Sequence, residues 1–134
     1  MTCPVGAMAA GSPVADAARA NDLAAVRTLI AAAADVNLAA ADGSTALLWA
    51  AYNADDEMIA ALLAAGADPN TPNRFGVTPL LQASRTGDAA TMKALLDGGA
   101  DPAVTHREGE TALMAAARTG RVDAVKLLLE HGAD

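Results

Sequence analysis

Residues 75–102 read "FGVTPLLQASRTGDAATMKALLDGGADP", and this stretch contains the pattern that decides the fold. Thr78 suits the cap of a short helix, because a threonine hydroxyl accepts hydrogen bonds from first-turn amides. Pro79 suits the first helical position, where a missing amide hydrogen costs nothing. Gly87 ends this helix, and a second helix follows before the "GGADP" turn. The stretch therefore predicts two short helices joined by a tight turn.

The pattern recurs every 33 residues. In the second copy Thr45 precedes the predicted helix "ALLWAAYN", and "DDEMIAALLAA" follows as a second helix with acids in its first turn, where the helix dipole favours them. The residues that keep the spacing are Asp35, Asp68, Asp101 and Asp134; Thr45, Thr78 and Thr111; Gly43, Gly76 and Gly109; Leu29, Leu62, Leu95 and Leu128; and Ala17, Ala50, Ala83 and Ala116. A pair of such short helices cannot bury its own apolar face, so each pair must stack on its neighbours.

The stretch 75–102 and the later "EGETALMAAARTGRVDAVKLLLEHGAD", residues 108–134, resemble successive repeats of the ankyrin repeat family. The resemblance implies an all-α solenoid of about four stacked helix–turn–helix units, joined by β-hairpin-like fingers in a curved array. Such arrays mostly bind other proteins and rarely catalyse reactions. The alanine-rich composition is similar to that of bacterial ankyrin repeat proteins.

The resemblance covers about residues 12–134 and divides them into repeats 12–39, 40–72, 73–105 and 106–134. The first copy is degenerate, with Ser12 in place of threonine. Residues 1–11 are expected to form an N-terminal extension. That segment carries Cys3, the single cysteine, so no disulfide within the chain is expected.

This sequence departs from the family pattern at three positions, one of which is the asparagine after "GADP", present as Asn70 in one repeat and replaced by Ala103 in the next. The histidine of the family's "TPLH" motif is replaced by Leu48, Leu81 and Met114, which removes any hydrogen bond from that histidine to the loops. The glycine that ends the first helix is Asn21 in the first copy and Ala54 in the second. Asparagine tolerates a left-handed backbone, whereas alanine is strained by it.

The turn in the second copy has two readings. Ala54 lies at the register of Gly87 and Gly120, so it is expected to take the positive φ despite its Cβ atom. The alternative is that Asn53 takes the left-handed conformation and that Ala54 begins the next helix. The unbroken 33-residue register of the flanking apolar residues favours Ala54.

The composition limits the classes of function. The chain has 134 residues, 53% of them hydrophobic but many of these alanine, and its net charge is −7, which argues against nucleic-acid binding. No apolar run approaches the roughly 18 residues that span a membrane. We expect a cytoplasmic protein, and a periplasmic or secreted location stays open because a removed export signal would leave no trace.

The resemblance implies a partner-binding surface on the concave face, formed by the finger tips and the first helix of each repeat. Carried over by position, the fingers present Ala41, Asp42, Ser44, Arg74, Phe75, Val77, Arg107, Glu108 and Glu110, and the helices present Arg19, Tyr52, Arg85 and Arg118. These residues include five arginines and three acids, a net charge of +2, which leaves −9 on the rest of the chain. The partner-binding residues that we predict are Arg19, Tyr52, Arg74, Phe75, Val77, Arg85, Arg107 and Arg118. We therefore expect a protein partner, and the charge contrast favours an acidic one.

Three alternatives concern single side chains. Phe75 could fold back over its finger and cover Leu81 or Pro72. The arginines could belong to a solvated face, paired with Asp42, Glu108 and Glu110, since surface pairs are common and weak. Trp49 precedes the repeated alanines and is expected to lie mostly in the core.

Catalysis, a metal site and a cofactor are not expected. "HREGE" places His106, Glu108 and Glu110 on a turn, where this spacing gives no fixed convergence, and His131 near Asp134 has no third ligand. The glycines are accounted for by turns and caps, and none forms a phosphate loop. The predicted function is a non-catalytic interaction module.

The alternative to an interaction module is a structural or self-associating array, or a piece of a longer repeat protein. The last copy stops directly after its second helix. The face formed by Val125, Leu128 and Leu129 is therefore expected to lack cover, which would favour association through the last repeat.

Overall fold

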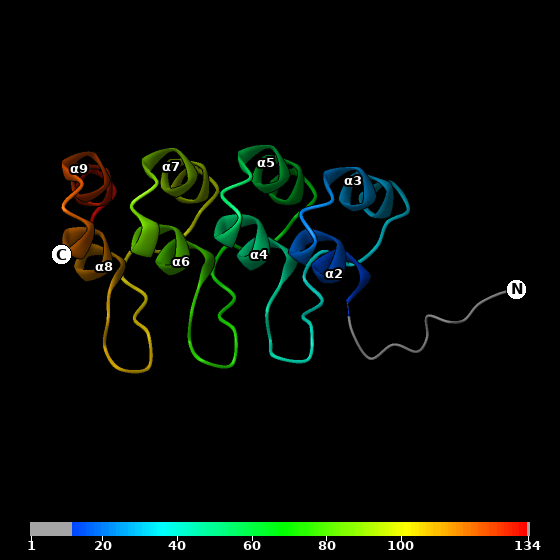
Figure 1. The fold of residues 1–134 in the computed structure, drawn as a ribbon, viewed down its shortest axis with the longest axis horizontal. Helices are drawn as coiled ribbons and strands as arrows, with labels where there is room; N and C mark the ends of the chain where they lie inside the picture. The colour runs from blue at the N-terminus through cyan, green and yellow to red at the C-terminus, as the bar shows by residue number, and fades with distance from the viewer. Residues whose placement is uncertain (1–11, 134) are drawn as a thin grey trace, which may run out of the picture.

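The computed structural model describes residues 12–133 of the chain, so residues 1–11, with Cys3, and Asp134 lie outside the described part. Eight helices fall within these residues and form two rows (Figure 1). The inner row, next to the finger loops, comprises α2 (Pro13–Arg19), α4 (Ala46–Tyr52), α6 (Pro79–Thr86) and α8 (Ala112–Thr119). The outer row comprises α3 (Leu23–Ala31), α5 (Asp56–Ala64), α7 (Ala89–Asp97) and α9 (Val122–Glu130).

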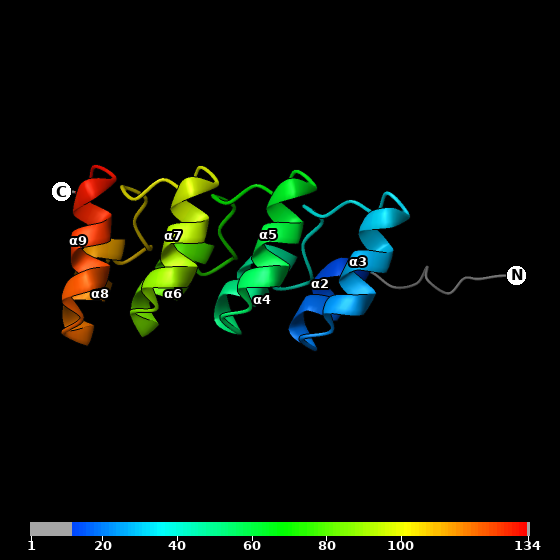
Figure 2. The ribbon, with the colours of Figure 1, turned by 90° about the horizontal axis from the view of Figure 1, so that it is seen from above.

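Each repeat contributes one helix to each row, and the repeats follow one another in chain order (Figure 2). Every inner helix contacts the next inner helix and the outer helix of its own repeat. This arrangement confirms the predicted all-α repeat solenoid. No helix within residues 12–133 is long and apolar enough to cross a membrane.

Most of the helices are preceded by a residue whose side chain caps the first turn. The inner helices follow Ser12, Thr45, Thr78 and Thr111, whose hydroxyls accept hydrogen bonds from the amides of Ala15, Leu48, Leu81 and Met114. The first three outer helices follow Asp22, Asp55 and Asp88, whose carboxylates accept from amides in the first turn. The predicted threonine caps are thus confirmed, and each stabilises its helix by roughly 1 kcal/mol.

The core runs between the two rows as one continuous cluster shared by all repeats. Leu62, Leu95 and Leu128 lie at the same register in α5, α7 and α9, and none of them is exposed. The expectation that the face of α9 lacks cover is therefore wrong for Leu128, which packs toward α7 within the core. Val125 is half-buried against this core, whereas Leu129 is exposed.

Two asparagines join successive repeats. The side-chain amide of Asn37 donates to the Gly66 carbonyl at 3.1 Å, and its side-chain carbonyl accepts from the Asp68 amide at 2.7 Å. Asn70 repeats both contacts, to Gly99 and Asp101, at the same distances. At the corresponding position of the third repeat the sequence has alanine, so this polar connection links only the first three repeats.

Ala54 carries the left-handed turn, with φ 54°, as the register predicts. Asn53 has a φ of −83° and caps the C-terminus of α4, so the alternative reading is wrong. Asn21, at the same register, has a φ of 58°. Ala33 also has a positive φ, of 62°, at the register of Gly66, and the sequence analysis does not predict this turn.

We expect Ala54→Gly to stabilise the protein by about 0.5–1 kcal/mol. Glycine removes a strain of roughly 1–2 kcal/mol, and its greater freedom in the unfolded chain offsets part of this gain. The control is Ala60→Gly, because Ala60 is exposed within α5, where glycine should destabilise by about 1 kcal/mol. Thermal melts of both variants should shift in opposite directions, and a lower melting temperature for Ala54→Gly would contradict the argument.

Candidate functional site

The inner face is the surface formed by the finger tips and the exposed side of α2, α4, α6 and α8. Each finger closes on itself by two backbone hydrogen bonds. The first runs from the amides of Ala40, Asn73 and His106 to the carbonyls of Ser44, Val77 and Glu110, at 2.9, 3.0 and 2.8 Å. The second returns to the carbonyls of Ala40, Asn73 and His106 from the amides of Gly43, Gly76 and Gly109, at 2.9, 2.9 and 2.8 Å. The amide of Arg74 also donates to the carbonyl of Asp42 at 3.1 Å, which joins two neighbouring fingers.

The helix positions predicted for this face lie where the register places them. Arg19, Tyr52, Arg85 and Arg118 lie at or next to the last residues of the four inner helices, and all four are exposed. On the fingers, Arg74, Phe75 and Arg107 are exposed as well. Seven of the eight predicted residues are therefore accessible on one side of the stack.

Val77 is the exception. It is only 8% exposed and forms a small apolar cluster with Leu48, Leu81 and Ala115. The two leucines take the place of the family's histidine, so apolar packing holds the base of the finger where a hydrogen bond would otherwise do so. Val77 therefore supports the finger and offers little surface to a partner, which corrects its prediction as a contact residue.

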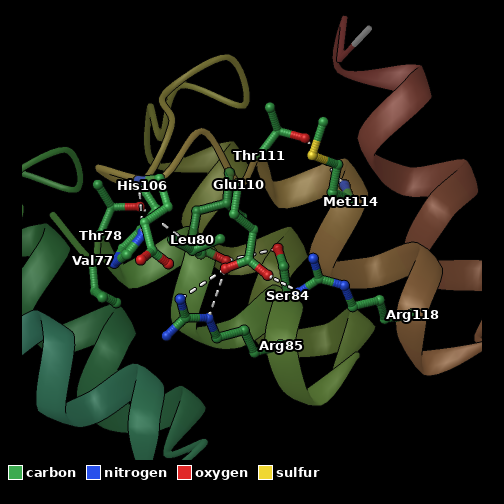
Figure 3. Close-up of polar contacts among 12 residues, drawn as sticks. Val77, Thr78, Leu80, Ser84, Arg85, His106, Glu110, Thr111, Met114 and Arg118 are labelled. Atoms are coloured by element: carbon green, nitrogen blue, oxygen red, sulfur yellow. Dashed lines mark hydrogen bonds and ion pairs between the residues drawn. The ribbon is translucent and has the colours of Figure 1, made fainter.

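Glu110 organises the C-terminal half of the inner face (Figure 3). Its Oε1 atom accepts from Nε and Nη2 of Arg85, at 3.0 and 2.7 Å, and its Oε2 atom accepts from Nη1 of Arg118. The Glu110 side chain is 12% exposed, and the hydrogen bond from Arg85 is the main reason why its pKa is lowered. The carboxylate therefore stays charged at neutral pH and holds two arginines from neighbouring helices.

The arginines were expected either to be open to a partner or to be paired with acidic residues of the same face, and the structure shows some of each. Arg85 and Arg118 are paired, as the alternative expected, and their partner is Glu110. By contrast, no ion pair within 4.0 Å joins Arg19, Arg74 or Arg107 to a carboxylate among residues 12–133. The unpaired positive charge of the inner face therefore lies on one inner helix and on two finger tips.

Asp42 is held locally within its own finger. Its carboxylate accepts from the amide and the hydroxyl of Ser44, at 2.9 and 3.0 Å. The amide of Ser44 contributes most to the lowered pKa of Asp42, and Arg74 contributes least among the causes. Asp42 is thus a turn-forming residue that stays charged, and Arg74 forms no ion pair within 4.0 Å among residues 12–133.

Aromatic side chains mark the N-terminal half of the inner face. The guanidinium of Arg19 lies 5.6 Å from the ring centre of Trp49, and the rings of Trp49 and Tyr52 meet edge to face at 5.6 Å. Trp49, which was expected to lie mostly in the core, is half-buried against it, whereas Tyr52 is 59% exposed. This part of the face therefore combines positive charge with apolar area.

Phe75 lies exposed at the tip of its finger. It is 53% accessible, and the guanidinium of Arg74 lies 5.3 Å from its ring centre. Asn73 supports the tip, because its side-chain oxygen accepts from the amides of Phe75 and Val77 at 2.9 and 3.0 Å. The alternative in which Phe75 folds back to cover Leu81 does not describe this structure.

The "HREGE" residues do not converge. His106 accepts from the Glu108 amide through Nδ1 at 3.3 Å, while the Glu110 carboxylate points to the two arginines (Figure 3). Within residues 12–133 no three His, Cys, Asp or Glu side chains lie close enough together to hold a metal ion.

Comparison with known proteins gives one family. A family model described as "Ankyrin repeats (3 copies)" matches residues 9–73 and 47–134, which together cover most of the chain. No curated protein sequence matches the chain.

Proposed function

Because the chain belongs to the ankyrin repeat family, whose members generally mediate protein–protein interactions, we propose that it binds an acidic segment of a partner protein on its inner face. The function proposed is non-catalytic binding. The face presents guanidinium and aromatic groups, and these are the groups enriched where interfaces derive most of their affinity.

The observation that carries the proposal is the contrast in charge between the inner face and the rest of the chain. Five of the nine basic residues lie on this face, although the whole chain has a net charge of −7. Arg19, Arg74 and Arg107 have no carboxylate partner within residues 12–133. An acidic segment would supply those partners and would be steered toward this face and away from the acidic remainder.

The test compares two triple variants that remove the same charge. Arg19→Ala, Arg74→Ala and Arg107→Ala together change the inner face, whereas Arg27→Ala, Lys93→Ala and Lys126→Ala change three outer helices. Proteins captured from a lysate of the source organism are identified, purified and titrated with all three forms. We expect the inner-face variant to bind about 10- to 100-fold more weakly, with less dependence on salt, while the outer variant binds like the wild type.

Equal binding by the two variants would contradict the proposal. Circular dichroism provides the control for folding, because all six side chains are exposed and their removal should leave the helix content unchanged. A partner lost equally from both variants would indicate an effect of net charge, with no preference for the inner face.

Self-association through the last repeat is the second candidate. Met114 on α8 and Val122 and Leu129 on α9 are all more than half exposed, which leaves apolar area on this repeat. A second copy of the chain, or another repeat, would cover it. Sedimentation velocity over a hundredfold range of concentration tests this candidate, and a monomer throughout the range would exclude it.

A further inference from the structure

Two of the three aromatic residues of the chain lie side by side. The sequence contains one Trp, one Tyr and one Phe among 134 residues. Trp49 and Tyr52 line a hollow of about 240 Å³ between α4 and the finger formed by residues 73–77, and Phe75 stands at the tip of that finger. Leu48 and Val77 also line the hollow, and Asp42, Ser44, Asn73 and Gln82 form its polar part, so its walls are mixed.

The charges around this hollow are arranged by sign. Asp42 is the charged residue that lines it, and Ser44 holds that carboxylate in place. Arg19 lies over the ring of Trp49, which lines the hollow, and Arg74 lies over the ring of Phe75 at the tip of the finger. A carboxylate inside the hollow would be repelled by Asp42, whereas a carboxylate beside Trp49 would meet Arg19, which pairs with no carboxylate among residues 12–133.

We propose that this hollow binds one apolar side chain of an extended partner segment and that an acidic residue of the same segment binds Arg19. The inference rests on the proposed function and deepens it by naming the anchor and its neighbour. An apolar side chain gains from burial against Trp49 and Tyr52, and aromatic rings of this kind are typical anchor sites.

The repeat spacing sets the distance between the two partner residues. Arg19 and Tyr52 occupy the same position on neighbouring inner helices, α2 and α4. Packed helices lie about 8–10 Å apart, and an extended chain advances about 3.3 Å per residue. The acidic residue therefore lies about three positions from the apolar anchor.

The pocket is formed before the partner binds. The edge-to-face contact of Trp49 and Tyr52 fixes one wall. Two contacts fix the other wall. The Asn73 side chain accepts hydrogen bonds from two backbone amides of its own finger, and the Arg74 amide donates a hydrogen bond to the backbone carbonyl of Asp42. Since few side chains need to be ordered on binding, even a short segment can bind measurably.

The test uses a random library of 12-residue peptides displayed on phage and selected on the wild-type chain. Selected peptides are synthesised with a fluorophore and titrated by anisotropy. We expect them to share an apolar residue with Asp or Glu three positions away. Tyr52→Ala should weaken their binding at least tenfold, as should serine in place of the apolar residue of the peptide, whereas Leu129→Ala on α9 should leave it unchanged.

Each outcome separates this inference from the proposed function. Selected peptides that lack the pattern, or that bind Tyr52→Ala as well as the wild type, overturn the anchor. If those same peptides bind the variant lacking Arg19, Arg74 and Arg107 more weakly, the proposed binding of an acidic segment stands without the apolar anchor. If no peptide is enriched, or if binding survives both sets of changes, both proposals fail.

Discussion

Leu95→Ala should lower the free energy of unfolding by about 3–4 kcal/mol. Leu95 lies in α7 with none of its surface exposed, in the same core cluster as Leu62 of α5 and Leu128 of α9, and α7 contacts both of these helices. Truncation loses the burial of the side chain and leaves a cavity. Many of the surrounding core residues are alanines, whose single methyl groups cannot move to fill it. Urea titration followed by circular dichroism measures the loss.

The matched control is Leu129→Ala. Leu129 lies in α9 and is 52% exposed, so the same truncation should cost less than about 1 kcal/mol. Because repeats contact only their neighbours, loss of an interior repeat also uncouples the two ends of the stack. A smaller urea dependence for Leu95→Ala would report that uncoupling, and similar losses for the two variants would contradict the central role of Leu95.

The sequence predicts the fold well because the signals that determine it are local and recur. The serine or threonine before each inner helix accepts a hydrogen bond from the amide three residues later, so the cap can be identified without any knowledge of the tertiary structure. The register then assigns Ala54 to the left-handed turn. Ala33 was missed because an alanine at the end of a helix gives no local sign of a positive φ, although the register of Gly66 contains that information.

The inner face is predicted less completely, since register gives the position of a residue but not its partners. Ser44, Val77 and Glu110 occupy one register and all have little exposed surface. Their side chains are polar, apolar and charged, so no composition pattern reveals that this position points inward. The pairing of Glu110 with two arginines depends on side-chain conformations from three separate segments, which a sequence pattern does not encode.

Gly43→Ala should destabilise the protein by about 2–3 kcal/mol. Gly43 has a φ of +84°, which strains any residue with a Cβ atom by roughly 1–2 kcal/mol. An added methyl group would also lie 2.9 Å from the Arg74 amide nitrogen and 3.3 Å from two backbone atoms of Asn73. These atoms belong to the neighbouring finger and cannot rotate away, so the finger itself must shift, at a further cost of about 1–2 kcal/mol.

Gly109→Ala separates the two contributions. Gly109 has a φ of +87°, close to that of Gly43, but a methyl group there would meet no atom within 4 Å. Gly109→Ala should therefore lower the free energy of unfolding, measured by urea titration, by about 1 kcal/mol. Equal losses of stability for Gly43→Ala and Gly109→Ala would show that the contact between fingers is unimportant. Because the Arg74 amide also donates to Asp42, Gly43→Ala should displace the finger that carries Phe75. A stability defect at Gly43 should thus be accompanied by weaker binding of the selected peptides, and the same defect at Gly109 should not.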